Sequence, residues 1–240
     1  MGNRAGSTPV ARTNTQVDIE GSYSKFMKTT FLLIRHGESQ ANSEHYFAGG
    51  IDALPTEKGK KQSKLTAKYV VENYRIDVVY SSDLNRALEI SNAIKELSAK
   101  PVIKDERLRE IYAGEWQGKT FDALEKEYKK NYGEWLRDIG NAVCDGGESV
   151  KNLYDRVWSF MDEVLSLEQG KTIAIVTHAT PIRALLTKMK GLSLEQMKTV
   201  AWVSNSSITE VVNVDGQWKI NCESLDEYLN EMRTVFPSNV

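Results

Sequence analysis

Two histidines that each close an apolar run are the residues of this sequence best suited to chemistry. Arg35 and His36 follow the run Phe31 to Ile34, and His178 follows the run Ile173 to Val176 after one threonine. A neutral imidazole can act as a nucleophile, and a guanidinium can bind the oxygens of an anion such as phosphate through paired hydrogen bonds. A plain turn after a strand, with the glycine at its bend, would explain the Arg-His-Gly tripeptide equally well.

The two apolar runs predict the strands that must position these histidines. Each run is short and lacks polar and apolar alternation, which is typical of a strand covered on both faces in an α/β sheet. The first run would deliver Arg35 and His36 to the edge of the sheet, where open α/β proteins bind their ligands. The spacing alone does not establish that His36 and His178 lie side by side.

A second arginine, Arg86, is expected in the first turn of a helix. The segment Asp77 to Ser82 predicts a strand, and Asp83 is a candidate N-cap of a helix that runs to about Leu97. A cation is mildly unfavourable at a helix N-terminus, so a solvated Arg86 is one interpretation. The same position suits a bound anion, because the guanidinium and the free backbone N–H groups would then point at it together.

Four segments of the chain resemble the signature motifs of one family. They are Arg35 to Asn42 (RHGESQAN, against RHG(E)xxxN), Ser81 to Ala87 (SSDLNRA, against SSxxxRA), Leu108 to Gly118 (LREIYAGEWQG, against LxExxxGxWEG) and Thr177 to Arg183 (THATPIR, against S/T-H-G-x-x-I-R). The family is the histidine phosphatase superfamily, also called the phosphoglycerate mutase-like family. The resemblance covers nearly all of residues 28 to 224, with the four motifs in family order.

The resemblance implies a catalytic set and a set of substrate contacts. The catalytic set is His36, Glu110, His178, Arg35 and Arg86, and the substrate contacts are Asn42, Ser39, Gly49 and Ala179. His36 would take the phosphoryl group, with its other ring nitrogen donating to a backbone carbonyl, and a protonated His178 would help to hold the phosphate. Glu110 would protonate the leaving alcohol and then activate water. Without the resemblance, a surface carboxylate paired with Arg107 or Arg109 would be the simpler account of Glu110.

The resemblance also implies the fold, a three-layer α/β/α sandwich with a mostly parallel sheet. Residues 27–240 would form a single histidine phosphatase domain, in which residues 119–147 are a small helical insertion over the active site. Residues 1–26 are rich in Gly, Ser, Thr and Asn and lack both periodicity and the apolar core of a signal peptide. We therefore expect a disordered leader or an artificial extension ahead of Met27.

Local patterns predict three further elements. Thr56 is a candidate N-cap of a helix whose apolar side carries Leu65, Tyr69 and, at its margin, Val70. Ser149 is a candidate N-cap of a second helix with a continuous apolar stripe. The dipeptide Asp215-Gly216 between two alternating runs predicts a β-hairpin near the end of the chain.

Composition restricts the partners. The chain has 240 residues with 31 basic and 33 acidic side chains, and its formal charge of -2 gives no general attraction to nucleic acid or to an anionic membrane. Three histidines without an HxxxH or CxxC pattern argue against a metal site, and no cofactor is implied. Cys144 and Cys222 form no paired motif, which fits the reducing cytoplasm. The expected partner is a small phosphorylated metabolite, and a homodimer stays open.

Departures from the family pattern favour a phosphatase over a mutase. Mutase members usually carry a tyrosine three residues after the acid, where this chain has Ala113, and a hydroxyl residue where it has Ala48. The expected function is therefore metal-independent hydrolysis of a small phosphomonoester through a phosphohistidine intermediate. Two alternatives stay open, a 2,3-bisphosphoglycerate-dependent phosphoglycerate mutase and a non-catalytic phosphate-binding regulatory module.

Overall fold

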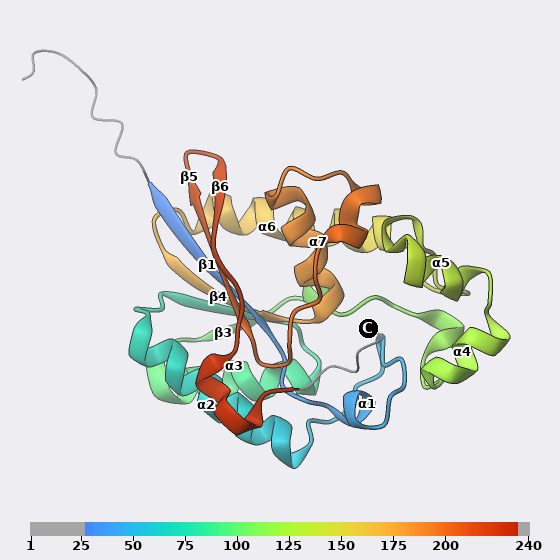
Figure 1. Ribbon diagram of the computed structural model, residues 1–240. Helices are drawn as coiled ribbons and strands as arrows, with labels where there is room; N and C mark the ends of the chain where they lie inside the picture. Colours follow the sequence, from blue (N-terminus) through green and yellow to red (C-terminus); the bar gives the residue numbers. More distant parts are fainter. Residues whose placement is uncertain (1–26, 235–240) are drawn as a thin grey trace, which may run out of the picture.

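Within residues 27–234, which the computed structural model describes, a six-stranded sheet runs through the centre of the protein (Figure 1). The strands are β1 (Lys28–Arg35), β2 (Val78–Ser81), β3 (Val102–Lys104), β4 (Thr172–Thr177), β5 (Ile208–Val214) and β6 (Gln217–Leu225). Their order across the sheet is β3-β2-β4-β1-β5-β6. The first four strands pair in parallel, and β5 pairs antiparallel with both β1 and β6. The predicted leader, residues 1–26, lies outside the described residues.

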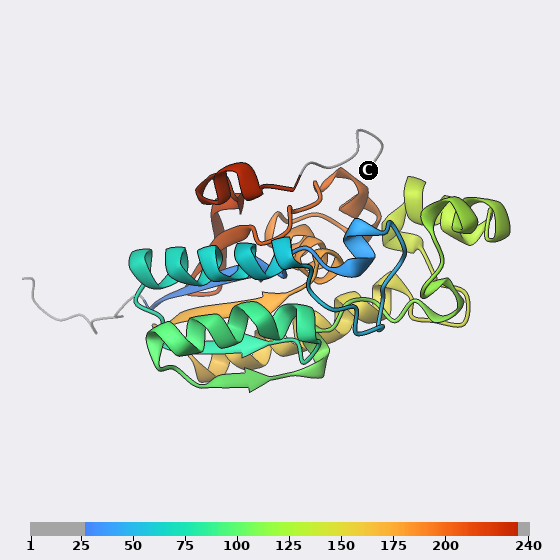
Figure 2. The ribbon, with the colours of Figure 1, turned by 90° about the horizontal axis from the view of Figure 1, so that it is seen from below.

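Helices cover both faces of this sheet (Figures 1 and 2). The four long helices are α2 (Glu57–Asn73), α3 (Asn85–Ser98), α6 (Val150–Leu167) and α7 (Ala179–Met189). Phe31 and Leu33 of β1 pack into the core under α6 and α7, whereas Leu32 and Ile34 pack into the core under α2 and α3. The run does not alternate because both faces of β1 are buried. The predicted three-layer α/β/α sandwich is confirmed.

The start of α3 differs from the prediction. Its N-cap is Leu84 and not Asp83, and no side chain of the cap residue bonds to the helix. Asp83 instead pairs with Arg109, at 2.5 Å between Oδ2 and Nη2. A distant loop caps α3, because Asp52 accepts hydrogen bonds from the backbone N–H and the side-chain amide of Asn85 at 2.7 and 2.6 Å. The nearest acidic residue in sequence is therefore not the one that satisfies the helix end.

The buried face of α2 also differs from the prediction. Thr56 caps the helix as predicted, and its hydroxyl accepts from the Gly59 N–H at 3.0 Å. Val70 is fully buried and Tyr69 is half-buried against the same core, as predicted. Leu65, however, is 37% exposed, whereas Gln62 is fully buried. The helix packs too closely for large side chains at this end, since a Cβ on Gly59 would lie 1.9 Å from the carbonyl oxygen of Glu38. Small and polar residues therefore form the contact between α2 and the turn that follows His36.

The two other predicted elements are present. Ser149 caps α6, with its hydroxyl accepting from the Asn152 N–H at 3.0 Å, and the apolar stripe of that helix is buried. The hairpin of β5 and β6 turns at Asp215 and Gly216, whose φ angles are 50° and 83°. These left-handed values suit the tight turn that such a dipeptide predicts.

Short helices between β3 and α6 extend beyond the end of the sheet, where Figure 1 labels α4 and α5. The short elements are α1 (Gln40–Ser43), α4 (Phe121–Glu127), α5 (Asn131–Arg137) and the single-turn segments η1 (Glu106–Leu108), η2 (Gly114–Trp116), η3 (Ile139–Asn141), η4 (Leu194–Thr199) and η5 (Glu227–Met232). Trp116 is fully buried and makes edge-to-face contacts with Phe47, Tyr132 and Trp135 at centroid distances of 5.7, 5.5 and 6.0 Å. This aromatic cluster holds α5 against the rest of the domain.

Candidate active site

The register of two neighbouring strands brings the histidines together. In the parallel pair of β1 and β4, Arg35 lies opposite Thr177. Both strands end at these residues, so His36 and His178 leave the sheet at the same level, and the His36 N–H donates to the Thr177 carbonyl at 3.0 Å. The two imidazole centroids are 5.0 Å apart. The adjacency that spacing could not establish therefore follows from strand register.

His36 is held by backbone groups. Its Nδ1 lies 2.6 Å from the carbonyl oxygen of Gly37, and Nδ1 carries the proton because a carbonyl can only accept. Burial lowers the pKa of His36 well below the ordinary histidine value, and the charges of Arg86 and Arg35 lower it further. His36 is therefore a neutral imidazole with its lone pair on Nε2, the form that a nucleophile needs.

His178 is held by side chains. The Nε of Arg86 donates to its Nδ1 at 3.2 Å, and its Nε2 lies 2.8 Å from the hydroxyl oxygen of Ser82. A guanidinium can only donate, so Nδ1 is unprotonated and the ring proton is on Nε2. Burial lowers the pKa of His178 well below the ordinary value, and Arg86 and His36 add to this shift. The expectation of a protonated His178 is therefore wrong for this arrangement, in which a neutral ring orients Arg86.

Arg86 is gripped by the loop between α1 and α2. Its Nη1 donates to the Ile51 carbonyl at 2.6 Å and its Nη2 to the Gly49 carbonyl at 2.9 Å, and the residue is 1% exposed. Gly49, a predicted substrate contact, thus holds Arg86 through its carbonyl. Together with the bond to His178, these contacts with described residues use three of the five N–H groups of the guanidinium. The two other N–H groups could donate to the oxygens of a bound anion.

That loop is itself fixed from two sides. Asp52 binds the N-terminus of α3, and the Gly50 N–H donates to Oε1 of Gln117 at 2.7 Å. Gly49 has a φ of 50°, and a Cβ at this position would lie 2.8 Å from the Cβ of Ala113. Both the conformation and the close approach require glycine. The position of Arg86 therefore depends on residues that never reach the histidines themselves.

Arg35 is anchored by the segment that precedes β5. Its Nη1 donates to the Val203 carbonyl at 2.5 Å, and its backbone N–H donates to the Ser207 carbonyl at 3.1 Å. Burial lowers the pKa of Arg35 to about 10, with Glu110 opposing the shift and Arg86 adding to it. Arg35 thus remains a cation at neutral pH and can offset the charge of a phosphoryl group.

Ser39 and Asn42, both predicted substrate contacts, belong to the turn that follows His36. Ser39 is the N-cap of α1 and is 1% exposed. Its backbone N–H and its hydroxyl both donate to Oδ1 of Asn42, each at 3.0 Å. Ser39 therefore orients the amide of Asn42, and the hydrogen atoms on Nδ2 of that amide face away from Ser39.

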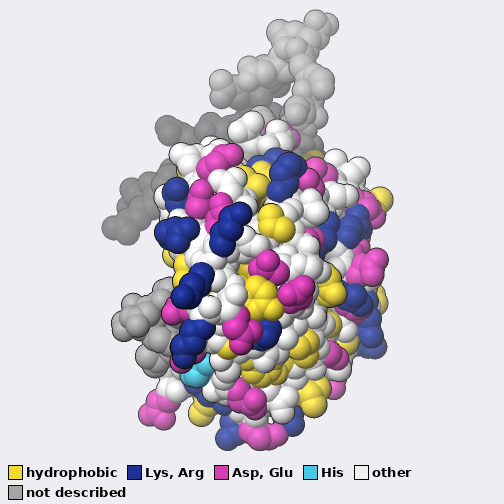
Figure 3. Space-filling model, turned by 90° about the vertical axis from the view of Figure 1, so that its right-hand side faces the viewer, with side chains coloured by type: hydrophobic (Ala, Val, Ile, Leu, Met, Phe, Trp, Pro, Cys, Tyr) yellow, Lys and Arg dark blue, Asp and Glu magenta, His cyan; other side chains and the backbone are white. Residues whose placement is uncertain are grey.

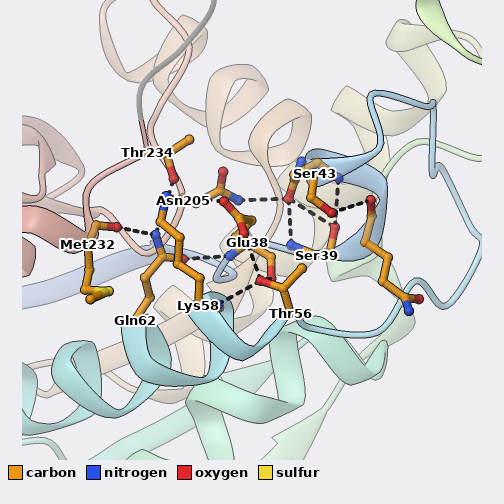
Figure 4. A network of polar contacts seen from close by, with 12 residues as sticks. Glu38, Ser39, Ser43, Thr56, Lys58, Gln62, Asn205, Met232 and Thr234 are labelled. Carbon is orange, nitrogen blue, oxygen red and sulfur yellow. Dashed lines mark hydrogen bonds and ion pairs between the residues drawn. The ribbon is translucent and has the colours of Figure 1, made fainter.

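Glu38 faces the start of α2, where it contacts Thr56 and Lys58 (Figure 4). Its carboxylate accepts from the Thr56 hydroxyl at 2.8 Å and pairs with Lys58 at 3.3 Å, and its backbone N–H donates to Oε1 of Gln62 at 2.8 Å. The other end of the Gln62 amide donates to the Met232 carbonyl at 2.7 Å. These contacts tie the turn after His36 both to the start of α2 and to the C-terminal segment.

Glu110 lies at the N-terminus of α7, next to His178. Its Oε1 accepts from the Ile111 N–H at 2.8 Å, and its Oε2 accepts from the Thr180 N–H at 3.3 Å. Ala179, a predicted substrate contact, is the first residue of α7, where helix N–H groups have no partner within the helix. The carboxyl group and the helix end can therefore approach the same substrate.

The surface ion-pair interpretation of Glu110 is wrong. Arg107 pairs with Asp105 at 2.6 Å, and Arg109 pairs with Asp83 at 2.5 Å. The guanidinium of Arg156 holds the backbone on both sides of Glu110. It donates to the carbonyls of Arg107, Arg109 and Glu110 at 2.7, 2.8 and 3.0 Å. Backbone contacts thus fix the position of Glu110, and neither Arg107 nor Arg109 forms an ion pair with its carboxyl group.

A cavity of about 560 Å³ adjoins Glu110 on the side of η1. Charged side chains of both signs contribute to its lining, which includes Glu106, Arg109, Tyr112 and Gln117. On the face shown in Figure 3, basic and acidic side chains are likewise interspersed, without a large area of one sign. The cavity has the size of small-molecule sites, and its charged residues could bind polar groups of a ligand.

Three further features bear on metal, membrane and redox chemistry. Across residues 27–234, no three His, Cys, Asp or Glu side chains are grouped so that they could hold a metal ion. No helix in that range combines the length and the apolar character needed to cross a bilayer. Cys144 and Cys222 are both free thiols.

Four residues that shape the site are not predicted from the sequence, namely Ser82, Asp52, Gln117 and Asn205. Ser82 belongs to the SSxxxRA segment, and its place directly after β2 could have indicated that it meets His178. Gln117 belongs to the Leu108 to Gly118 motif segment, but that motif does not indicate its contact with Gly50. Asp52 and Asn205 lie in loops far from their partners in sequence, and no local pattern marks them. Asn205 reaches the His36 carbonyl at 3.3 Å from 169 residues away.

The chain is similar to several known proteins. The model of the histidine phosphatase superfamily (branch 1) matches residues 31–225. Phosphoserine phosphatase 1 of Hydrogenobacter thermophilus is 33% identical over 165 residues, which cover 69% of this chain and 78% of that protein. Phosphoglycerate mutase-like protein 4 of Arabidopsis thaliana is 30% identical over 194 residues, which cover 79% of this chain and 82% of that protein. The solved structure of Bacillus stearothermophilus YhfR is 26% identical and superposes with a TM-score of 0.80 over 84% of this chain and all of that chain.

Proposed function

The chain belongs to the histidine phosphatase superfamily, branch 1, and on that basis we propose that it hydrolyses small phosphomonoesters through a phosphohistidine on His36. The observation that carries the proposal is the hydrogen bond from Nδ1 of His36 to the Gly37 carbonyl at 2.6 Å. It fixes the tautomer whose Nε2 can attack, in a site that also contains the cations Arg35 and Arg86.

In the first step, Nε2 of His36 attacks the phosphorus atom and the bond to the alcohol oxygen breaks. Arg35 and Arg86 hold the phosphoryl oxygens while charge redistributes among them. Glu110 gives its proton to the leaving oxygen, so that the product departs as an alcohol. In the second step, Glu110 takes a proton from water, the hydroxyl attacks phosphorus, and the bond to Nε2 breaks to release inorganic phosphate.

The leaving group is proposed to be a small polar alcohol. It must lie on the side of Glu110, because that residue protonates it, and the cavity of about 560 Å³ adjoins Glu110 there. Arg109 and Glu106 in its lining offer both signs of charge. The relative from Hydrogenobacter thermophilus is named for phosphoserine, so phosphoamino acids belong in the first substrate screen, beside sugar phosphates and phosphoglycerates.

Ala113 supports hydrolysis over mutase chemistry. Its methyl group faces Gly49 in a closely packed contact, and the residue is fully buried. It cannot offer a hydroxyl to a second phosphorylated substrate, which a mutase must hold after the first transfer. Water is then the expected acceptor of the phosphoryl group.

The proposal is tested by comparing phosphate release with isomerisation. The purified protein is assayed with p-nitrophenyl phosphate, with and without EDTA, and with 3-phosphoglycerate. We expect phosphate release that EDTA does not change and no formation of 2-phosphoglycerate. Rapid isomerisation would favour the mutase, and a lack of turnover from acid to neutral pH would favour a non-catalytic binding module.

A further inference from the structure

Asn205 lies behind the nucleophile in the segment of residues 203–207, directly before β5. It is 1% exposed, and its side chain bridges two parts of the turn after β1 (Figure 4). Its Nδ2 lies 3.3 Å from the His36 carbonyl oxygen and 3.1 Å from Oδ1 of Asn42. Neither contact is predicted by any motif in the sequence.

Backbone groups at the two ends of this network fix the orientation of both amides. The His36 carbonyl can only accept, so the atom of Asn205 that faces it is the nitrogen. The Ser39 N–H can only donate, so the atom of Asn42 that faces it is the oxygen. The contact between the two amides is therefore a hydrogen bond from Nδ2 of Asn205 to Oδ1 of Asn42.

Three donors converge on Oδ1 of Asn42, namely the Ser39 N–H, the Ser39 hydroxyl and Nδ2 of Asn205. With its oxygen held in this way, the amide of Asn42 presents Nδ2 on the opposite side, as a donor. We propose that Asn205 is a positioning residue that fixes this donor on a phosphoryl oxygen, an inference that rests on the proposed function. Asn205 itself does not touch the substrate.

The effect of Asn205 acts through Asn42 more than through His36. The His36 carbonyl also accepts from the Ser206 N–H at 3.0 Å, so it stays satisfied when the Asn205 side chain is removed. The Asn42 amide has no such substitute from the segment of residues 203–207. Loss of Asn205 would remove one of the three donors on Oδ1 and leave the two Ser39 donors to hold it, so the position of the Asn42 amide would be less tightly fixed.

The segment that carries Asn205 is held firmly enough for this task. The Ser204 hydroxyl donates to Oδ2 of Asp226 at 2.7 Å, and the hydroxyl of Tyr228 donates to the Ser206 carbonyl. Tyr228 in turn stacks on Tyr69 of α2 at a centroid distance of 4.4 Å. A side chain can orient a functional group only when its own backbone is fixed in this way.

A double-mutant cycle tests the proposal. We would measure turnover of p-nitrophenyl phosphate and inhibition by orthovanadate for wild type, Asn205→Ala, Asn42→Ala and the double variant. We expect Asn205→Ala to weaken vanadate binding by about tenfold, the loss of one hydrogen bond that acts on a charged ligand. In the Asn42→Ala background, the same change should weaken it by less than about threefold, because the two residues act as one unit.

Asn213→Ala is the matched control. Asn213 is also a buried asparagine, 3% exposed, but it lies at the opposite end of β5, where its Oδ1 accepts from the Gly216 N–H at 3.0 Å. The Asn213→Ala variant should have a lower midpoint of thermal unfolding than the wild type but the same inhibition by vanadate. If Asn205→Ala does not fold, Asn205→Asp keeps the shape of the side chain and enters the same cycle.

The outcomes separate this inference from the proposed function. The inference would be overturned if the losses of vanadate affinity from the two single variants multiplied in the double variant. Unchanged vanadate inhibition in Asn205→Ala would also overturn it. In both cases, turnover by the wild-type protein would leave the proposed function intact. A wild-type protein without turnover and without vanadate binding would overturn both.

Discussion

The two histidines of the site follow similar sequences, an apolar strand and one polar residue, yet they are held in opposite ways. His36 rests on a backbone carbonyl, that of Gly37, which fixes the proton on Nδ1. His178 rests on the side chains of Arg86 and Ser82, which occupy both of its ring nitrogens. Of these two rings, only that of His36 therefore keeps a nitrogen for bond formation with phosphorus.

Under the proposed mechanism, this difference gives the two histidines different roles. A nucleophile needs one fixed tautomer, and a backbone carbonyl provides it whatever the neighbouring side chains are. A residue that arranges a charged group needs contact with that group, and His178 has it through Arg86. The account predicts that substitutions on the His178 side reduce catalysis in steps, whereas loss of His36 removes it.

The largest effect is expected from the histidines themselves. His36→Ala should remove both turnover and the phosphoenzyme, because both ring nitrogens of His178, the other histidine of the site, are engaged by Arg86 and Ser82. His178→Ala should lower kcat/KM by about 10²-fold, the effect of losing one group that organises charge stabilisation, and should retain the phosphoenzyme. Steady-state assays and acid quench of labelled enzyme measure the two effects. Equal loss of phosphoenzyme in both variants would contradict the claim that the two histidines have different roles.

Ser82→Ala tests the side-chain support of His178. It removes the hydroxyl that lies 2.8 Å from Nε2, so the ring can rotate and Arg86 loses its fixed partner. We expect kcat/KM to fall by about tenfold, the effect of one lost hydrogen bond on a charged site. Ser81→Ala is the matched control, since Ser81 is equally buried but donates to a backbone carbonyl. If the two variants behave alike, Ser82 has no special role.

Asp52→Ala tests the loop that grips Arg86. It removes the acceptor for both donors of Asn85 at the start of α3, and loss of such a cap costs about 1 kcal/mol of unfolding free energy. KM should rise with it, because the loop carries the carbonyls that hold Arg86. Asp83→Ala is the control, since that residue pairs with a partly exposed Arg109 and should cost less than about 0.5 kcal/mol. Urea denaturation and steady-state kinetics distinguish them, and a larger cost for Asp83→Ala would contradict the assignment of the cap.

The smallest effect concerns pH. The pKa of His36 and that of His178 are both lowered in the folded chain, first of all by burial, from an ordinary value of 6.5. Below that value the unfolded chain binds protons that the folded chain does not, so the free energy of unfolding falls as pH decreases. The urea midpoint should be lower at about pH 5.5 than at about pH 7.5. The difference should shrink in the double variant His36→Asn/His178→Gln, and an unchanged difference would show that these rings are not its cause.

The strands and the motif residues could be predicted from the sequence because their signals are local. The run Phe31 to Ile34 is apolar throughout since both faces of β1 are buried, and a run of this kind marks a central strand. His36 and His178 meet because the ends of parallel strands share one sheet edge. The roles expected of these two histidines come from the resemblance to the family and not from the sequence pattern alone.

The support of the site could not be predicted, because it consists of contacts between distant segments. Asp83 stands where a helix cap is expected, but Asp52 reaches the same helix end from a loop 33 residues away. Leu65 satisfies the helical pattern of α2, yet the close approach of Gly59 to Glu38 selects small and polar residues there. Asn205 has no local signal at all. Such contacts depend on how distant segments of the chain pack against each other, and a local sequence pattern does not determine that.

The most direct test is to locate the phosphoryl group. Enzyme mixed with a ³²P-labelled phosphomonoester is quenched within the first turnover and digested, and the modified residue and ring nitrogen are identified by mass spectrometry and ³¹P NMR. We predict acid-labile phosphate on Nε2 of His36, absent from His36→Ala and still present in His178→Ala. Phosphate on His178, or on Nδ1 of His36, would contradict the account.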